Sequence, residues 1–234
     1  KKRILTFVRW LLKEGYTNNS FDDVKIFNQD HEQAEGINYL SIEEVERLIA
    51  TIRQKVSEDI KSGYQNKNRN ALWLIDLINW QRYSGMRISE TLNLRARDIN
   101  TNTWEVTIGS EIYSTKSKAK QVLPIAEIDP LVRIAEKLLR EANGETDRLF
   151  QHKDRRRTSR TFKKYLRLAL PEREKITLHS LRHTCCIELL RAGVPIYTVQ
   201  RWMRHASIKT TQRYADLLRT DIGKAVAAGF EHIE

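Results

Sequence analysis

The chain has 234 residues, of which 41 are Lys or Arg and 30 are Asp or Glu, so its formal net charge is +11. This length suffices for one substantial domain with an appendage. The positive balance favours a polyanionic partner, most commonly nucleic acid, although a merely basic soluble protein shares it. The sequence contains no signal peptide and no apolar run near the length of a membrane span, so we expect a cytoplasmic protein that contacts no membrane.

The cysteines argue against disulfide and zinc chemistry. Cys185 and Cys186 are adjacent, and a bridge between neighbours is strained, so we expect free thiols in a reducing compartment. With six His, two Cys and no Cys-x-x-Cys, the spacing builds no zinc-type cluster. We therefore expect no metal and no cofactor.

The beginning of the chain predicts a helix and a linker. Apolar residues recur at helical spacing over residues 3–13, and Gly15 ends the pattern. The chain begins with Lys1 rather than Met, so we interpret residues 1–15 as the end of a domain from a longer protein. Residues 16–38 are polar with weak periodicity, which indicates a linker. A domain over residues 39–234 follows.

The next segments are helical. Ser41-Ile-Glu-Glu44 is a capping box, and it predicts a helix to about residue 60. Residues 71–83 are rich in Leu, Ile and Trp, which predicts a helix buried on most sides. Ser84-Gly85 ends that helix, and another is expected from residue 88 to about residue 95.

The periodicity then changes to alternation over residues 104–108, 111–115 and 121–125. We predict a small three-stranded antiparallel β-meander in a mainly α protein, an α+β arrangement, with a charged tip at 116–120. Helices resume after Pro130. They are expected over 130–142, 158–169 and 177–192, from Pro195, over the final motif, and as a tail over 216–228.

Residues near the C-terminal end suit phosphate chemistry. On a helix, His179 and Arg182 share one face. Arg182 offers a planar fork of donors that matches two phosphate oxygens, and His179 can donate to an oxygen or pass a proton near neutral pH. His183 lies about 100° round the helix from Arg182, so we predict that it packs or caps. A His-x-x-Arg pair alone also arises by accident in basic helices.

Upstream segments supply further charge. Arg87 follows Ser84-Gly85-Met86 at the start of a helix, where anions bind well, and Glu90 on the same face can hold it. A surface ion pair is the other reading of these two residues. The hairpin tip carries Lys116, Lys118 and Lys120, and it is either solvated or an arm that places one Lys against a leaving oxygen.

Tyr214, nine residues after His205, offers a nucleophile. A phenol with a pKa of about 10 attacks a phosphodiester once cations stabilise its anion, and it leaves again as easily. The resulting phosphotyrosine linkage stores the phosphodiester bond, which suits strand exchange rather than hydrolysis. A lone Tyr is more often a core residue, so the inference rests on the combination of motifs.

The motifs Ser-Gly-Met-Arg-Ile-Ser-Glu, a Lys-bearing β-tip ending in Val-Leu-Pro, His-Ser-Leu-Arg-His-Thr and His-x8-Tyr occur in one order. This order resembles the tyrosine recombinase (phage integrase-type) family over residues 39 to about 220. The resemblance implies that family's catalytic-domain fold and a site-specific recombinase that cleaves and rejoins DNA through a 3′-phosphotyrosyl intermediate. It also implies that residues 1–15 end a core-binding domain, and that the protein serves a mobile element.

Carried over by motif, the resemblance implies a role for each candidate residue. The phosphate-contacting group is Arg87, Arg182, His179 and His205, with His179 also exchanging the proton of the nucleophile. Tyr214 attacks, Glu90 supports the first arginine, and Lys116 protonates the 5′-oxygen leaving group, with Lys118 as its rival. The family commonly has Leu-Gly before its second histidine, where this chain has Met203-Arg204. The extra charge suggests that Arg204, like Lys118 and Lys120, contacts DNA.

The partners implied are double-stranded DNA and other recombinase protomers in a tetrameric synapse on it. The predicted helix over 216–228 has an apolar face that packs either on its own body or on a neighbouring subunit. Two alternatives remain, a type IB topoisomerase-like relaxing enzyme and a non-catalytic DNA-binding regulator on the same fold. A Mg²⁺ nuclease is disfavoured, because the Asp and Glu residues fall mostly on solvated helix faces.

Overall fold

The computed structural model describes residues 36–62, 71–109, 120–150 and 154–218. Several predictions lie outside the described residues: the helix over 3–13, most of the linker over 16–38, Lys116, Lys118 and the tail beyond residue 218. The helices are α2 (Ile42–Lys61), α3 (Leu72–Ser84), α4 (Ile88–Asn93), α5 (Asp129–Glu141), α6 (Arg155–Ala169), α7 (Leu178–Arg191), α8 (Ile196–Met203) and α9 (Ile208–Leu217), and a short 3-10 helix, η3 (Ala96–Asp98), follows α4.

The helix boundaries follow from local capping. The capping box of α2 forms as predicted, with the Glu44 N–H on the Ser41 hydroxyl and the Ser41 N–H on the Glu44 carboxylate. Helix α6 begins three residues earlier than predicted, because the Asp154 side chain accepts from the Arg157 N–H at 3.1 Å and caps that end. The mainly helical prediction is confirmed.

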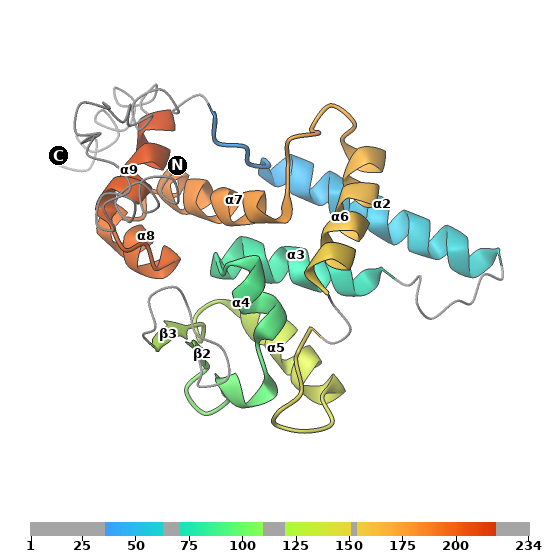
Figure 1. The fold of residues 1–234 in the computed structure, drawn as a ribbon, viewed down its shortest axis with the longest axis horizontal. Helices are drawn as coiled ribbons and strands as arrows, with labels where there is room; N and C mark the ends of the chain where they lie inside the picture. Colours follow the sequence, from blue (N-terminus) through green and yellow to red (C-terminus); the bar gives the residue numbers. More distant parts are fainter. Residues whose placement is uncertain (1–35, 63–70, 110–119, 151–153, 219–234) are drawn as a thin grey trace, which may run out of the picture. The chain divides into compact units, whose positions relative to one another are not determined.

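Helix α3 lies at the centre of the core. As predicted, it is buried on most sides, and it packs against α2, α5 and α7 (Figure 1). Trp80 is fully buried, and its ring meets that of Phe150 edge-on at 6.1 Å between centroids. Burying each large apolar side chain contributes about 1.5–3 kcal/mol. The C-terminal end of α3 is therefore a rigid support for the turn that leads into α4.

The three-stranded antiparallel sheet is confirmed, but its strands differ from the prediction. Its order is β1 (Ile99–Asn100), β2 (Glu105–Ile108) and β3 (Gln121–Pro124), and β2 pairs directly with β3, with Ile108 opposite Gln121. Strands β2 and β3 fall within the predicted strands over 104–108 and 121–125, whereas the predicted strand over 111–115 lies outside the described residues. Strand β1 was missed because two residues carry no detectable alternation.

The C-terminal part of the described chain is also more continuous than predicted. Tyr214, Asp216 and Leu217 all belong to α9, so no link separates Tyr214 from the start of the expected tail helix. The two cysteines are free and buried, as predicted. Among the described residues, no helix is both long and apolar enough to cross a membrane.

Candidate active site

The turn between α3 and α4 is the point at which distant parts of the chain meet. Gly85 ends α3 in the left-handed conformation, with φ 59° and ψ 16°. A Cβ on this residue would lie 2.6 Å from Met203 Sδ and 3.2 Å from Cys185 Sγ, so α7 and α8 pack directly on its backbone. Only glycine meets both demands without strain.

Arg87 and Glu90 form the rim of the site. Arg87 is the N-cap of α4; its N–H donates to Glu90 Oε2 at 2.9 Å and its Nη1 donates to Oε1 at 2.8 Å. The Arg87 side chain is 36% exposed, whereas that of Glu90 is 6% exposed. The carboxylate therefore holds one terminal nitrogen of the Arg87 guanidinium and leaves part of the side chain facing solvent, where an anion can reach it.

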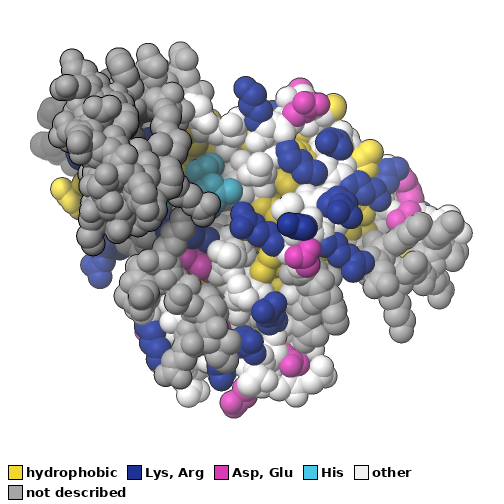
Figure 2. Space-filling view, viewed as in Figure 1, with side chains coloured by type: hydrophobic (Ala, Val, Ile, Leu, Met, Phe, Trp, Pro, Cys, Tyr) yellow, Lys and Arg dark blue, Asp and Glu magenta, His cyan; other side chains and the backbone are white. Residues whose placement is uncertain are grey.

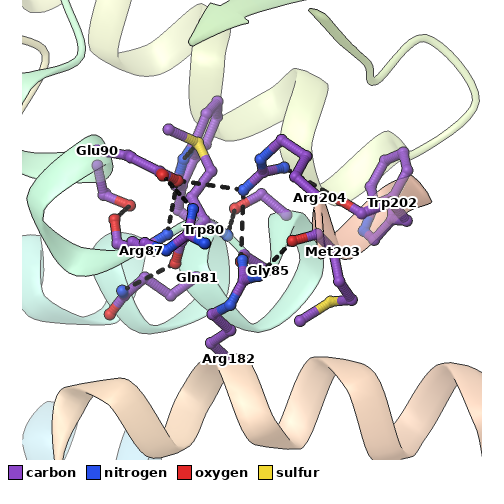
Figure 3. A network of polar contacts seen from close by, with 12 residues as sticks. Trp80, Gln81, Gly85, Arg87, Glu90, Arg182, Trp202, Met203 and Arg204 are labelled. Atoms are coloured by element: carbon purple, nitrogen blue, oxygen red, sulfur yellow. Dashed lines mark hydrogen bonds and ion pairs between the residues drawn. The ribbon is translucent and has the colours of Figure 1, made fainter. Parts of the chain in front are cut away.

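Arg182 reaches the same turn from α7. Its two terminal nitrogens donate to the backbone carbonyls of Gly85 and Met203, and the residue is 3% exposed (Figure 3). A guanidinium has five N–H groups, so these bonds fix its plane without using all of its donors. Burial, then the charges of Arg204 and Arg87, lower its pKa to about 10, and it stays cationic at neutral pH.

His179, His183 and Tyr214 form a second group. His179 and His183 lie one turn apart on α7, with their rings edge to face at 4.7 Å. The Tyr214 hydroxyl lies 2.7 Å from His183 Nδ1, and Tyr214 is 6% exposed. We predicted that His183 packs or caps; in the structure it also forms a hydrogen bond with the Tyr214 hydroxyl, because α9 packs against α7.

His205 closes the group from the loop between α8 and α9. Its Nδ1 lies 2.9 Å from the buried Thr211 Oγ1, and its ring stacks parallel to that of Tyr214 at 6.1 Å between centroids. Its backbone N–H donates to Gln200 O at 3.0 Å. Two ring contacts and one backbone hydrogen bond therefore hold His205 beside the phenol.

The electrostatics of the group keep the imidazoles neutral and the phenol protonated. Burial, followed by nearby positive charges, lowers the pKa of all three histidines. The pKa of His179 is lowered, the pKa of His183 falls to about 4 and the pKa of His205 falls to about 3. Burial raises the pKa of Tyr214 to about 12, against the opposing charges of Arg182 and Arg213. A bound anion would offset the positive field in which these groups lie.

The expected DNA contact of Arg204 stays a prediction, and in the structure this residue is 9% exposed and turns inward. Its Nη2 lies 3.3 Å from Glu90 Oε2. Lys120 is exposed and lies directly before β3, so a DNA contact there stays a prediction. The Lys116 and Lys118 predictions fall outside the described residues. Among those residues, no group of three or more His, Cys, Asp or Glu side chains converges as a metal site requires.

A basic surface lies near the histidines. Figure 2 shows histidine side chains on one face and, beside them, Lys and Arg side chains gathered over the region of α6 and α2. The exposed basic residues of α6 are Arg155, Arg156, Arg157, Arg160, Lys164 and Arg167. The charge of Arg155 also acts on His179. The basic face of α6 is thus close enough to act on one of the candidate residues.

The fold is that of tyrosine recombinase catalytic domains. The catalytic domain of bacteriophage HP1 integrase matches with a TM-score of 0.52 at 21% identity, over 80% of this chain and 94% of that one. The XerA recombinase structure matches with a TM-score of 0.58 at 23% identity, over 80% of this chain and 63% of that one. This chain thus spans less than two thirds of the XerA structure.

The chain belongs to the Phage integrase family, whose model matches residues 38–220. It is 27% identical to tyrosine recombinase XerA of Pyrococcus furiosus over 237 residues, which is 95% of this chain and 78% of the relative. It is 25% identical to tyrosine recombinase XerD of Oceanobacillus iheyensis over 225 residues, 92% of this chain and 69% of that protein.

Proposed function

We propose that this chain is the catalytic part of a site-specific DNA recombinase that cleaves and rejoins strands through a 3′-phosphotyrosyl intermediate. The observation that carries the proposal is the convergence of Arg87, Arg182, His205 and Tyr214, from three helices and a loop, on the α3–α4 turn and the adjoining face of α7. A buried Tyr hydroxyl among fixed cations and imidazoles is what transesterification of a phosphodiester needs.

In the proposed reaction, the scissile phosphate binds against the exposed part of Arg87 and the remaining donors of Arg182. His179 and His205, held neutral by burial, donate one N–H each to its non-bridging oxygens. Two fixed guanidinium groups supply the positive field that a metal ion provides in other phosphoryl-transfer sites. Removing one such donor typically costs 10²–10³ in rate.

The hydrogen bond to His183 changes the expected path of the proton. Tyr214 oxygen attacks phosphorus as its proton passes to His183 Nδ1, which lies 2.7 Å away, and the bond from phosphorus to the 5′-oxygen breaks. With pKa values of about 12 for Tyr214 and about 4 for His183, the phenol keeps its proton in the resting site. A bound phosphate raises the pKa of His183 by its charge, so the attack depends on substrate.

This substrate dependence is testable without turnover. The pKa of His183 would be followed by NMR in the Tyr214→Phe variant, with and without a short DNA duplex. We expect an upward shift on DNA binding, and the same titration of His183→Asn would confirm the assignment of the signal. An unchanged pKa in saturated complex would contradict the assigned proton path.

The 5′-oxygen needs a proton when it leaves, and we assign that proton to Lys116. A DNA in which sulfur replaces the 5′-oxygen tests the assignment, because a thiolate leaves without protonation. Lys116→Ala should cleave normal DNA slowly and the sulfur-containing DNA at nearly the wild-type rate. If Lys118→Ala shows this pattern instead, Lys118 is the acid.

The proposed partner is double-stranded DNA, held mainly by its phosphates. The exposed arginines of α6 favour this partner, because cations that contact phosphates release counterions on binding. Charge reversal at Arg156 should weaken DNA binding and lower the slope of log affinity against log salt by about one or more. Charge reversal at the exposed Arg140 of α5 is the matched control. Equal effects of the two reversals would argue against α6 as the DNA-contacting face.

One experiment decides between the candidate functions. The protein is incubated, with EDTA, with a nicked suicide DNA that carries its recombination site, and covalent protein–DNA adducts are separated under denaturing conditions. An adduct that forms with the wild type and disappears in Tyr214→Phe supports the proposal. DNA binding without any adduct would favour the non-catalytic regulator, and relaxation of plasmids of arbitrary sequence would favour the topoisomerase-like enzyme.

Two further assignments belong to this proposal. Residues 39–234 would form the catalytic domain, preceded by the end of a core-binding domain. Protomers would assemble on DNA through an exchanged tail helix over 216–228. DNA as the partner is supported by the XerH site-specific recombinase, whose structure bound to palindromic difH substrate matches with a TM-score of 0.57 over 82% of this chain and 53% of that one. A chain ending at Thr220 that still forms synaptic complexes normally would contradict the exchange.

A further inference from the structure

Arg204 adopts a backbone conformation that costs energy for a residue with a side chain. Its φ is 54° and its ψ 43°, in the left-handed region, and among the described residues Trp104 is the other non-glycine residue with positive φ. Glycine takes this conformation freely, whereas a Cβ crowds the following carbonyl oxygen. The residue ends α8 and directly precedes His205. A strained arginine at this place needs a compensating contact.

The side chain supplies that contact inside the site. Arg204 Nη2 donates to Glu90 Oε2 at 3.3 Å and to Gly85 O at 3.5 Å, while Nη1 donates to Trp202 O at 3.1 Å. The Arg204 and Glu90 side chains are 4% and 6% exposed. The pair is therefore almost completely buried. An unpaired charge in a buried site is costly, so each of the two groups strongly constrains the position of the other.

Glu90 is shared between two arginines. Arg87 occupies one side of the carboxylate and Arg204 the other (Figure 3). Burial alone would raise the pKa of Glu90, but the charge of Arg204 and the hydrogen bonds from Arg87 outweigh it and the pKa is lowered. Without Arg204, the carboxylate would have Arg87 as its main partner and would draw that guanidinium inward, away from solvent.

We infer that Arg204 is a positioning residue of the active site: it holds Glu90, and through Glu90 it sets the direction in which Arg87 faces the scissile phosphate. The inference rests on the proposed function, because it assigns Arg87 to the phosphate. It needs no contact between Arg204 and DNA. The same residue also fixes the bend that presents His205.

The test compares substitutions that separate the backbone from the side chain. Arg204→Gly relieves the left-handed strain and removes the ion pair, whereas Arg204→Lys keeps the charge without the planar fork. We expect adduct formation at saturating DNA to fall about 10²-fold in Arg204→Gly and less in Arg204→Lys. Arg201→Ala, which removes an exposed arginine from the same helix, should stay within about twofold of wild type. A purely conformational role predicts instead that Arg204→Gly is as active as wild type, and that result would overturn the inference.

The pH profile gives a readout that a merely structural role would not move. Three guanidinium groups act on Glu90, those of Arg87 on its own helix, Arg204 on α8 and Arg182 on α7. Removing Arg204 raises the pKa of Glu90, so the acid limb of the rate profile should move to higher pH. In a Glu90→Gln background, which has no carboxylate to hold, Arg204→Gly should cost much less than in wild type. An equal cost in both backgrounds would refute the coupling.

A measurement without turnover keeps this inference separate from the proposed function. The carboxyl pKa of Glu90 is followed by NMR in folded wild type, Arg204→Gly and Arg204→Lys, each checked by circular dichroism. We expect an upward shift in Arg204→Gly and a smaller one in Arg204→Lys. No shift would refute the positioning role even if wild type forms the adduct. A shift in a protein that forms no adduct would refute the proposed function alone.

Discussion

Gly85→Ala tests whether the α3–α4 turn is fixed both by its backbone conformation and by what packs on it. The left-handed φ of 59° costs a residue with a Cβ about 1–2 kcal/mol. The new Cβ would also lie 2.6 Å from Met203 Sδ and 3.2 Å from Cys185 Sγ, and overpacking of this kind costs about 1–3 kcal/mol. We therefore expect the free energy of unfolding to fall by about 2–5 kcal/mol.

The chain offers two matched controls for this change. Gly193 has a φ of 78° with no atom within 4 Å of the position of a Cβ, so Gly193→Ala measures the conformational part alone, about 1–2 kcal/mol. Gly144 has the same open space without a positive φ, and Gly144→Ala should change stability by less than about 0.5 kcal/mol. Unfolding in urea, followed by circular dichroism, measures all three. If Gly85→Ala lowers the free energy of unfolding no more than Gly193→Ala does, Met203 does not pack against the turn as described.

The buried histidines should make the fold sensitive to acid. In the unfolded chain these histidines bind protons near pH 6.5, whereas in the folded chain His183 and His205 bind them only near pH 4 and pH 3. The free energy of unfolding should therefore fall as the pH drops below 6.5, by up to about 1.4 kcal/mol per pH unit for each histidine. A urea midpoint equal at pH 7 and pH 5 would contradict this. Arg182→Lys should leave the Gly85 carbonyl, the Met203 carbonyl or both without the donor that Arg182 supplies. The free energy of unfolding in urea should fall by about 1–3 kcal/mol, and the rate of adduct formation by about 10²–10³-fold. A variant with wild-type values for both would show that the planar guanidinium of Arg182 is dispensable. Burial raises the pKa of Cys185 and Cys186 to about 12, so both thiols should react with iodoacetamide only after unfolding, and fast labelling of the folded chain would be the contrary result.

The parts of the fold that were predictable are those with a local cause. The helix from Ser41 follows from a capping box, and α3 follows from an unbroken apolar pattern. The strands were less predictable. Pairing of β2 with β3 is decided by the register between distant residues, which alternation within one segment does not reveal.

The candidate site was predictable in its residues and not in their contacts. The motifs identify Arg87, Arg182 and Tyr214, but the packing of α9 against α7 decides that Tyr214 reaches His183. Helix geometry alone places His183 away from Arg182. It does not show which face of α7 meets Tyr214, so the contact between His183 and Tyr214 could not be predicted.

The inward position of Arg204 could not be predicted for a related reason. A cation in a DNA-binding protein is reasonably assigned to DNA, and the sequence does not show that the residue before His205 turns back toward α4. The indication of this contact was Glu90. Its carboxylate is buried at the start of α4, and a partly exposed Arg87 alone does not compensate the cost of burying that negative charge. A buried carboxylate with one partner is a reason to look for a second.

The polar contacts around the turn also determine how mutational data on this site should be interpreted. The Gly85 carbonyl accepts from Arg182 and Arg204, and the Glu90 carboxylate accepts from Arg204 and Arg87, so the three guanidinium groups are linked through two shared acceptors. Removing any one of them changes the partners of another. The loss of rate from a single substitution therefore includes the displacement of its neighbours, and the losses will not add. A residue in this group need not touch the phosphate for its removal to weaken the clamp as a whole.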